Sequence, residues 1–201
     1  RAKNLVINGR VSDKSKSRSG LLRPFYLALS SQVDSVLAQS ERDAERFRSL
    51  GFANVFSVGN TKFDAAIEEA KGTKDWRIEL GVPPGAKVVV VGSTRGTGED
   101  ALVCDALKES GLIYDKDAWI IHAPRHVENA PAIGDLYLAA GAVSVAIRTK
   151  GESGRILIID TFGELGGIYS IAEVAVIGGG FGKTGGQNLL QPLAYGVPVV
   201  H

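Results

Sequence analysis

Short apolar runs alternate along the whole chain with longer segments in which apolar residues recur three or four positions apart. The short runs, rich in valine and isoleucine, predict strands, and the longer segments predict helices. The predicted strands are residues 5–8, 35–38, 55–58, 87–91, 118–122, 143–147, 156–159, 174–177 and 199–200. The predicted helices are residues 24–31, 41–50, 76–80, 98–110, 127–140, 165–171 and 188–195. This alternation is typical of βαβ units, so we expect an α/β fold with doubly wound parallel sheets.

The alternation is interrupted between residues 60 and 86. That stretch holds a polar helical segment, a Lys-Gly-Thr-Lys break at 71–74, and Pro83-Pro84-Gly85 before the next strand. We therefore predict the C-terminal part of one Rossmann-like domain at residues 1–66 and a linker at 67–86. Most of a second Rossmann-like domain follows at 87–201, truncated at its C-terminus. The chain has no methionine and begins almost directly with a strand, so we expect a fragment of a longer protein.

The composition is that of an ordinary globular protein, with 201 residues, 44% hydrophobic, 22% charged and a net charge of +1. This charge gives no case for a nucleic-acid partner, and no apolar run reaches the roughly 18 residues of a membrane span. No signal peptide is recognisable. The single cysteine, Cys104, excludes an intrachain disulfide, fits a reducing compartment and lies in an apolar helical pattern that predicts burial. A basic stretch at 14–23 predicts a solvated loop, with contact to anionic lipid headgroups as the alternative.

The strongest functional signal is a glycine-rich loop between the strand at 174–177 and the helix at 188–195. Its glycines are Gly178, Gly179, Gly180, Gly182, Gly185 and Gly186. Glycines allow backbone N–H groups to approach a ligand closely, and the N-terminus of the following helix favours an anion. We therefore predict a site for a phosphorylated ligand, with a mobile surface loop as the alternative.

Two other chemistries fit this chain poorly. Gly182-Lys183-Thr184 suggests a nucleotide-triphosphate loop, but the first glycine of that motif would have to stand where Ile177 does. His122 and His126 suggest a zinc pair, but Pro124 between them argues against a helix and no third ligand has matching spacing. We expect neither an ATPase nor a metal site.

Polar residues also follow three other strands, at the sheet edge where ligands bind in open α/β folds. After the strand at 87–91, Ser93, Thr94 and Arg95 could bind an anion, the alternative being a turn in which Thr97 caps the next helix. After 118–122, Arg125 is a candidate for phosphate or nucleobase contact.

The third strand followed by polar residues is 156–159, and those residues lie at 160–165. Asp160 or Thr161 could cap the helix that follows, and the free N–H groups of that helix could bind a nucleobase edge. Beyond the glycine-rich loop, Gln191 could reach sugar hydroxyls, with an ordinary surface glutamine as the alternative.

Seven motifs occur in one order along nearly the whole chain. They are NGRVS (8–12), AQSERDAERF (38–47), GNTKFD (59–64), STRGTGE (93–99), PRHVEN (124–129), DTFGEL (160–165) and GGQNLLQP (185–192). Each motif is weak by itself, but together they resemble the 3-deoxy-D-manno-octulosonic acid (Kdo) transferases of lipopolysaccharide synthesis. That resemblance implies an inverting glycosyltransferase of the two-domain GT-B fold.

The resemblance further implies a CMP-Kdo donor and a lipid A precursor as acceptor. The enzyme would act at the cytoplasmic face of the bacterial inner membrane, touching it peripherally through the missing domain. The resemblance implies no metal and no cofactor, and it puts the catalytic glutamate upstream of Arg1, so no catalytic residue is expected here. Together with the residue patterns, it gives a predicted donor-binding set of Ser93, Thr94, Arg95, Pro124, Arg125, Gly163, Glu164, Leu165, Gly185, Gly186, Gln187, Asn188, Leu189, Leu190 and Gln191.

Two positions depart from the family pattern. Gln187 stands where the family has histidine, and Gln191 stands where it has a glutamate expected near the ribose hydroxyls. A neutral amide can still bond a diol, but the loss of a charge-assisted bond costs roughly 1–2 kcal/mol. The alternatives are another GT-B enzyme, such as a UDP-sugar transferase or a sugar-nucleotide 2-epimerase, and an inactive nucleotide-sugar binding module.

Overall fold

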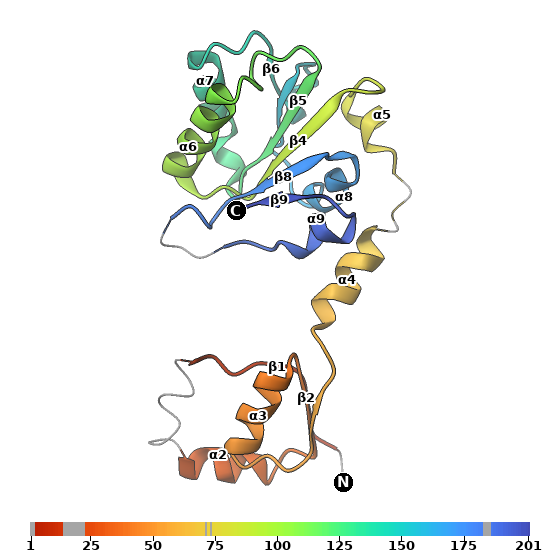
Figure 1. Cartoon of the computed structure of the whole chain (residues 1–201), viewed down its shortest axis with the longest axis vertical. Helices are drawn as coiled ribbons and strands as arrows, with labels where there is room; N and C mark the ends of the chain where they lie inside the picture. The colour runs from red at the N-terminus through yellow and green to blue at the C-terminus, as the bar shows by residue number, and fades with distance from the viewer. Residues whose placement is uncertain (1–2, 14–22, 71, 73, 183–185) are drawn as a thin grey trace. The chain divides into compact units, whose positions relative to one another are not determined.

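The computed structural model describes residues 3–13, 23–70, 72, 74–182 and 186–201 (Figure 1). The chain forms two compact units, Arg1–Ala65 (unit 1) and Ala66–His201 (unit 2). Three of the four basic residues of the 14–23 stretch, Lys14, Lys16 and Arg18, lie outside the described residues. No helix among the described residues is long and apolar enough to cross a membrane.

Unit 1 contains a three-stranded parallel sheet in the order β1 (Leu5–Gly9), β2 (Ser35–Ala38) and β3 (Val55–Ser57). Helices α2 (Arg23–Ser30) and α3 (Glu41–Ser49) follow β1 and β2, and the division between the units falls within α4 (Thr61–Ala70). A small apolar core between the sheet and α3 includes Val36, Ala44 and Phe52. Apolar residues on one face of the sheet and on one face of α3 therefore hold unit 1 together.

Helix α3 begins after Ser40, which caps its N-terminus. Ser40 accepts a hydrogen bond from the backbone N–H of Asp43 at 3.1 Å and donates its own hydroxyl to the Asp43 carboxylate at 2.7 Å. The helix ends before Gly51, whose φ of +98° is favourable only for glycine. The observed helix, Glu41–Ser49, thus agrees with the predicted range 41–50 to within one residue.

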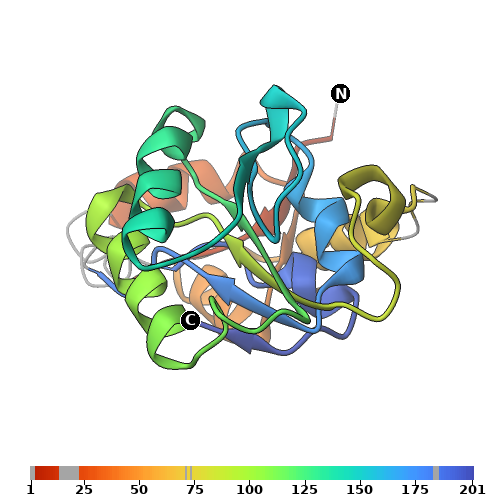
Figure 2. The same ribbon diagram turned by 90° about the horizontal axis from the view of Figure 1, so that it is seen from above.

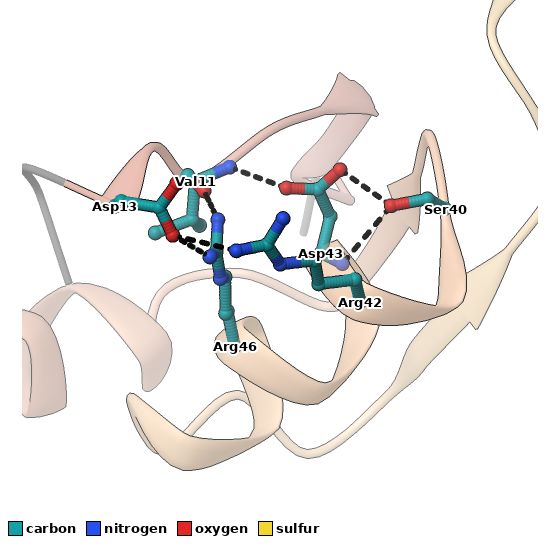
Figure 3. Close-up of polar contacts among 6 residues, drawn as sticks. All are labelled: Val11, Asp13, Ser40, Arg42, Asp43 and Arg46. Carbon is teal, nitrogen blue, oxygen red and sulfur yellow. Dashed lines mark hydrogen bonds and ion pairs between the residues drawn. The ribbon is translucent and has the colours of Figure 1, made fainter.

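A charged network fastens the segment after β1 to α3 (Figure 3). Asp43 accepts the Val11 N–H at 2.9 Å, and Arg46 donates to the Val11 carbonyl oxygen and to Asp13. Arg42 binds the same Asp13 carboxylate at 2.8 Å. Burial opposes ionisation of Asp43, but hydrogen bonds from Val11 and Ser40 outweigh it and lower the pKa of this carboxyl group. Residues of the AQSERDAERF motif therefore serve to hold the NGRVS segment in place.

Unit 2 contains a six-stranded parallel sheet in the order β6-β7-β5-β4-β8-β9. The strands are β4 (Lys87–Gly92), β5 (Ala118–Ala123), β6 (Val145–Ile147), β7 (Ile156–Ile158), β8 (Val174–Ile177) and β9 (Val199–Val200). The strand order reverses beside β4, since β5 pairs with one of its edges and β8 with the other. This is a doubly wound sheet with its switch point between β4 and β8, and the predicted fold class is confirmed.

Helices cover both faces of this sheet (Figures 1 and 2). The helices of unit 2 are α5 (Trp76–Leu80), α6 (Gly96–Glu109), α7 (Ala130–Ala139), α8 (Leu165–Ile168) and α9 (Leu190–Ala194). Short 3₁₀ turns lie at Val127–Asn129, Arg148–Lys150 and Tyr169–Ile171. One face packs on α6 and α7 around Ile120 and Tyr137, and the other packs on α5, α8 and α9 around Ile121 and Tyr169.

The segment at 67–86, for which a linker is predicted, contributes to the second of these layers. Trp76, Leu80 and Val82 are buried in the core against the sheet of unit 2. Asp75 caps α5 by accepting the N–H groups of Arg77 and Ile78 at 3.0 and 3.2 Å. The prediction that Cys104 is buried is also confirmed, because its side chain lies in the α6 and α7 layer, 3% exposed.

Three candidate helix caps, Thr97, Asp160 and Thr161, do not cap the helices that follow them, for identifiable reasons. Thr97 does not cap α6, which begins at Gly96, because Glu99 reaches back to the backbone N–H of Arg95, the capping residue. Asp160 does not cap α8, since its carboxylate instead accepts the N–H and hydroxyl of Thr149. Thr161 does not cap it either, because its hydroxyl donates to Glu164.

Candidate functional site

A cavity of about 220 Å³ opens at the carboxyl edge of the unit 2 sheet. Its walls come from the loops after β4, β5 and β7 and from the starts of α8 and α9. The lining residues are Ser93, Ala123, Pro124, Arg125, Val127, Thr161, Phe162, Gly163, Leu165, Gly166 and Gln191. Six of the predicted donor-binding residues are therefore brought together from four separate parts of the sequence: Ser93, Pro124, Arg125, Gly163, Leu165 and Gln191.

Arg125 supplies the positive charge of this cavity. Its backbone N–H donates to the carbonyl oxygen of Thr94 at 3.0 Å, which fixes the chain, while its side chain is exposed. No hydrogen bond or ion pair joins its guanidinium to another residue that the structure describes. A cation positioned in this way is available to bind an anionic ligand.

Ser93 is held in an uncommon backbone conformation at the cavity wall. Its φ is +59°, and its N–H donates to the carbonyl oxygen of Ala123 at 2.7 Å. Directly before it, Gly92 has no room for a side chain, since a Cβ there would lie 2.1 Å from the Tyr169 hydroxyl. The turn after β4 is thus tied both to β5 and to the helical layer beneath it.

Thr94 lies beneath the cavity and does not line it. Its side chain is buried, and its hydroxyl is 2.9 Å from Nε2 of His122, whose Nδ1 is 3.0 Å from the Tyr137 hydroxyl. The carboxylate of Asp100, also buried, lies 3.6 Å from His122 Nε2. Thr94 therefore supports the turn from below, and His122 belongs to this buried network.

Glu164 also turns away from the cavity. Its carboxylate accepts hydrogen bonds from Arg148 at 3.3 and 3.4 Å and from the hydroxyl of Thr161. Arg148 pairs with Glu79 of α5 as well, and these hydrogen bonds raise the pKa of the guanidinium. Glu164 therefore anchors the start of α8, while its neighbours Gly163, with φ of +83°, and Leu165 face the cavity.

The described part of the glycine-rich loop is bonded largely to the protein itself. The N–H of Gly178 donates to the Gly92 carbonyl oxygen at 2.8 Å, and that of Gly179 donates to both carboxylate oxygens of Glu99 at 2.9 and 2.8 Å. A Cβ on Gly178 would lie 2.4 Å from the Thr94 Cα, so the two loops are in close contact. Gly185, with Lys183 and Thr184, lies outside the described residues.

Arg95 and Gln187 bond to each other outside the cavity lining. With its amide oriented so that both polar atoms are satisfied, the Gln187 oxygen accepts from Arg95 Nε at 3.0 Å and Nη2 at 3.3 Å. The glutamine at this departure from the family pattern thus holds an arginine in place.

The remaining predicted residues, Gly186, Asn188, Leu189 and Leu190, do not line the cavity. Gly186 is exposed, and the Asn188 side chain accepts the N–H of Leu190 at 3.0 Å, so α9 begins two residues later than predicted. Leu189 packs against the core, and Leu190 is half-buried at the first turn of α9. Gln191, one residue further, reaches the cavity.

Sequence reasoning missed Phe162 and Glu99. Phe162 lines the cavity, and 80% of its surface is exposed. A phenylalanine between Thr161 and Gly163, in a loop already assigned to ligand binding, was the available signal. Glu99 belongs to the STRGTGE motif, but no sequence pattern shows that this helical residue contacts Gly179, in a loop 80 positions away.

Comparison with known proteins relates both units to one family. Residues 1–65 match the family described as 3-deoxy-D-manno-octulosonic-acid transferase (kdotransferase). A bifunctional glycosyltransferase/methyltransferase of Fusobacterium nucleatum is 34% identical over 98% of this chain and 31% of its own length. A 3-deoxy-D-manno-octulosonic acid transferase of Aquifex aeolicus is 31% identical over 86% of this chain and 45% of its own length. The chain thus spans less than half the length of these relatives.

Among solved structures, the C-terminal CMP-Kdo binding domain of WaaA from Acinetobacter baumannii is similar to this chain. The match has a TM-score of 0.54 and 25% identity, and it covers 68% of this chain and 69% of that domain. The resemblance predicted from the seven motifs is confirmed. By sequence over nearly its whole length, and by fold, this chain is a relative of the 3-deoxy-D-manno-octulosonic acid transferases.

Proposed function

We propose that the cavity of unit 2 binds CMP-Kdo, and that the protein transfers Kdo from this donor to a lipid A precursor. The observation that carries the proposal is the arrangement of the cavity, in which an arginine without a described partner faces aromatic, hydroxyl and amide groups. The relationship to a CMP-Kdo binding domain supports the choice of ligand. On this proposal unit 2 is the donor side and unit 1 part of the acceptor side of a GT-B enzyme.

Each lining residue then has a role suited to its chemistry. Arg125 would bind the donor phosphate, and Ser93 would add a hydroxyl beside it. The backbone around Gly163 and Leu165 would hold the nucleobase edge, and the amide of Gln191 would bond the ribose hydroxyls. The 220 Å³ of space lies somewhat below the range of about 300–1,000 Å³ that is usual for small-molecule sites.

The reaction would be a displacement at the anomeric carbon of Kdo. An acceptor hydroxyl loses its proton and attacks this carbon as the bond to the CMP phosphate oxygen breaks, and CMP leaves with the bonding electrons. Arg125 would stabilise the charge that grows on the departing phosphate. We assign no residue of this chain to proton removal from the acceptor, and we place the reaction at the cytoplasmic face of the inner membrane.

Calorimetric titration of the chain with CMP and with UDP tests the donor site. We expect CMP to bind more tightly, and Arg125→Ala to weaken CMP binding at least tenfold, about 1.4 kcal/mol, because a charge-assisted contact is lost. Lys108→Ala is the control, since Lys108 is an exposed cation of α6 that does not line the cavity. Equal CMP affinity in Arg125→Ala and the parent chain would contradict the proposed role of the arginine.

The same titration separates the alternatives. Tighter binding of UDP would favour a UDP-sugar enzyme of the same fold over a Kdo transferase. If CMP binds but the complete protein does not move Kdo from CMP-Kdo to a lipid A precursor, the site belongs to a binding module. Transfer of Kdo with CMP released would support the full proposal.

A further inference from the structure

Glu99 links two loops that lie far apart in the sequence. It is in the first turn of α6 and only 8% exposed. Its carboxylate accepts the Arg95 N–H at 2.7 Å, in the turn after β4, and the Gly179 N–H at 2.8 and 2.9 Å, in the loop after β8. These two loops flank the switch point of the doubly wound sheet, the usual place of a ligand in this architecture.

Further contacts near Glu99 join the described ends of the glycine-rich loop to the turn after β4. Gly178 donates to Gly92 at 2.8 Å and lies so close to Thr94 that no side chain fits between them. Gln187 bonds Arg95 from the far end of the same loop. The carboxylate therefore lies at the centre of a set of contacts that joins the glycine-rich loop to the turn carrying Ser93.

The charge of Glu99 has a second consequence. A backbone N–H of a glycine-rich loop is a natural partner for a phosphate, but here the Gly179 N–H is already bound to an internal anion. A phosphate at the same point would meet a carboxylate and would be repelled. An anionic ligand is therefore directed to Arg125 and Ser93, on the cavity side of the turn.

We propose that Glu99 is a positioning residue of the donor site: its buried carboxylate fixes Gly178 and Gly179, at the start of the glycine-rich loop, against the 93–95 turn and excludes the donor phosphate from Gly179. The inference rests on the proposed function, because it concerns the CMP-binding geometry of the same cavity. It assigns to the first half of the glycine-rich loop a supporting role, in place of the phosphate contact that its sequence predicts.

Substitution Glu99→Gln tests this role with little change of shape. Glutamine keeps one accepting oxygen, but its NH₂ group faces N–H donors and the negative charge is gone. We expect the amide protons of Gly179 and Arg95, followed by NMR, to exchange with solvent at least tenfold faster, and CMP affinity to fall at least fivefold. The matched control is Glu109→Gln, an exposed glutamate at the other end of α6, for which neither value should change.

Glu99→Asp separates positioning from folding. Aspartate is shorter but retains the charge, so it should recover part of both the exchange protection and the CMP affinity lost in Glu99→Gln. Amides of β5 and α7 should stay protected in both variants, which would show that unit 2 remains folded. General loss of that protection in both variants would mean that Glu99 acts on folding, and would overturn the proposal.

The remaining outcomes are distinct. If the parent chain binds CMP and Glu99→Gln binds it equally well, the positioning role is wrong while the proposed function stands. If exchange quickens at Gly179 without loss of CMP affinity, Glu99 is a structural link only, and the proposal is again overturned. If the parent chain does not bind CMP, the proposed function fails, and the positioning role with it.

Discussion

The two units hold their sequence motifs in place by different means. In unit 1, a three-stranded sheet with a small core relies on Asp43 and Arg46, two buried charged residues, to fasten the segment after β1. In unit 2, the six-stranded sheet lies between two apolar layers, and the buried carboxylate of Glu99 links two loops at the carboxyl edge.

The same difference distinguishes two motifs of the one family pattern. Asp43 and Arg46 of the AQSERDAERF motif bond the protein's own backbone, whereas Arg125 of the PRHVEN motif faces a cavity. A shared family motif therefore marks a structural role in unit 1 and a candidate ligand contact in unit 2. Four substitutions test this contrast.

The largest effect is expected for Asp43→Ala. The change leaves the Val11 N–H without its acceptor and removes one charge from the network with Arg46, which should cost about 3 kcal/mol in the free energy of opening of unit 1. Native-state hydrogen exchange of the β1 and β2 amides measures this free energy. The control is Glu45→Ala, because Glu45 is an exposed acidic residue of α3. Equal protection of the β1 amides in both variants would show that the small apolar core holds unit 1 together without Asp43.

Gly178→Ala should disturb the carboxyl edge of unit 2. The new methyl group would lie 2.4 Å from the Thr94 Cα, so the loop must shift, at a cost of about 2 kcal/mol and at least a tenfold loss of CMP affinity. Gly98→Ala is the matched control, because nothing lies within 4 Å of its Cβ and alanine favours a helix. Thermal unfolding and CMP titration of both variants measure the two effects. Unchanged CMP affinity in Gly178→Ala would show that the close contact between the two loops does not matter for binding.

Phe162→Ala examines the exposed aromatic side chain at the cavity. If Phe162 stacks on the cytosine ring, its removal should weaken CMP binding by about 1–1.5 kcal/mol with no loss of stability, since the side chain is 80% exposed. Ribose 5-phosphate, which has no base, should bind both proteins equally. A parallel loss for this ligand would place the phenylalanine elsewhere in the site.

The smallest effect is expected for Gln191→Glu, which restores the residue of the family pattern. A carboxylate could accept two hydrogen bonds from the ribose diol, so CMP binding should tighten by roughly 1 kcal/mol. The gain should vanish with 2′,3′-dideoxy-CMP, which lacks the diol. An equal gain for both nucleotides would indicate a long-range effect of charge, and no gain would place Gln191 outside the ribose subsite.

The sequence predicted the elements of the fold well because burial on a parallel sheet requires apolar runs such as 87–91 and 174–177. It also predicted that Ser93, Arg125 and Gly163 would meet, since the carboxyl ends of parallel strands share one edge. What it could not predict was the direction of neighbouring side chains. Irregular loops have no period, so nothing in the pattern distinguishes Ser93, in the cavity wall, from Thr94, buried beneath it.

The same lack of information about side-chain direction explains why the role predicted for Glu164 differs from its observed contacts. As a charged residue in a ligand-binding motif it was predicted to contact the donor, but its partner is Arg148, which lies 16 residues away and also pairs with Glu79 of α5. Such ion pairs depend on the packing of α5 against α8, and the sequence of the DTFGEL motif alone contains no information about it. In loops of this kind, residue type predicts chemistry better than it predicts position.

The position of Cys104 and of both tryptophans has a practical consequence. All three lie in unit 2, where burial raises the pKa of the Cys104 thiol and Trp76 and Trp119 pack in or against the core. Indole fluorescence and thiol alkylation will therefore report the opening of unit 2, while the opening of unit 1 leaves both signals unchanged. A melting curve recorded by either probe would count a protein with unit 1 unfolded as intact.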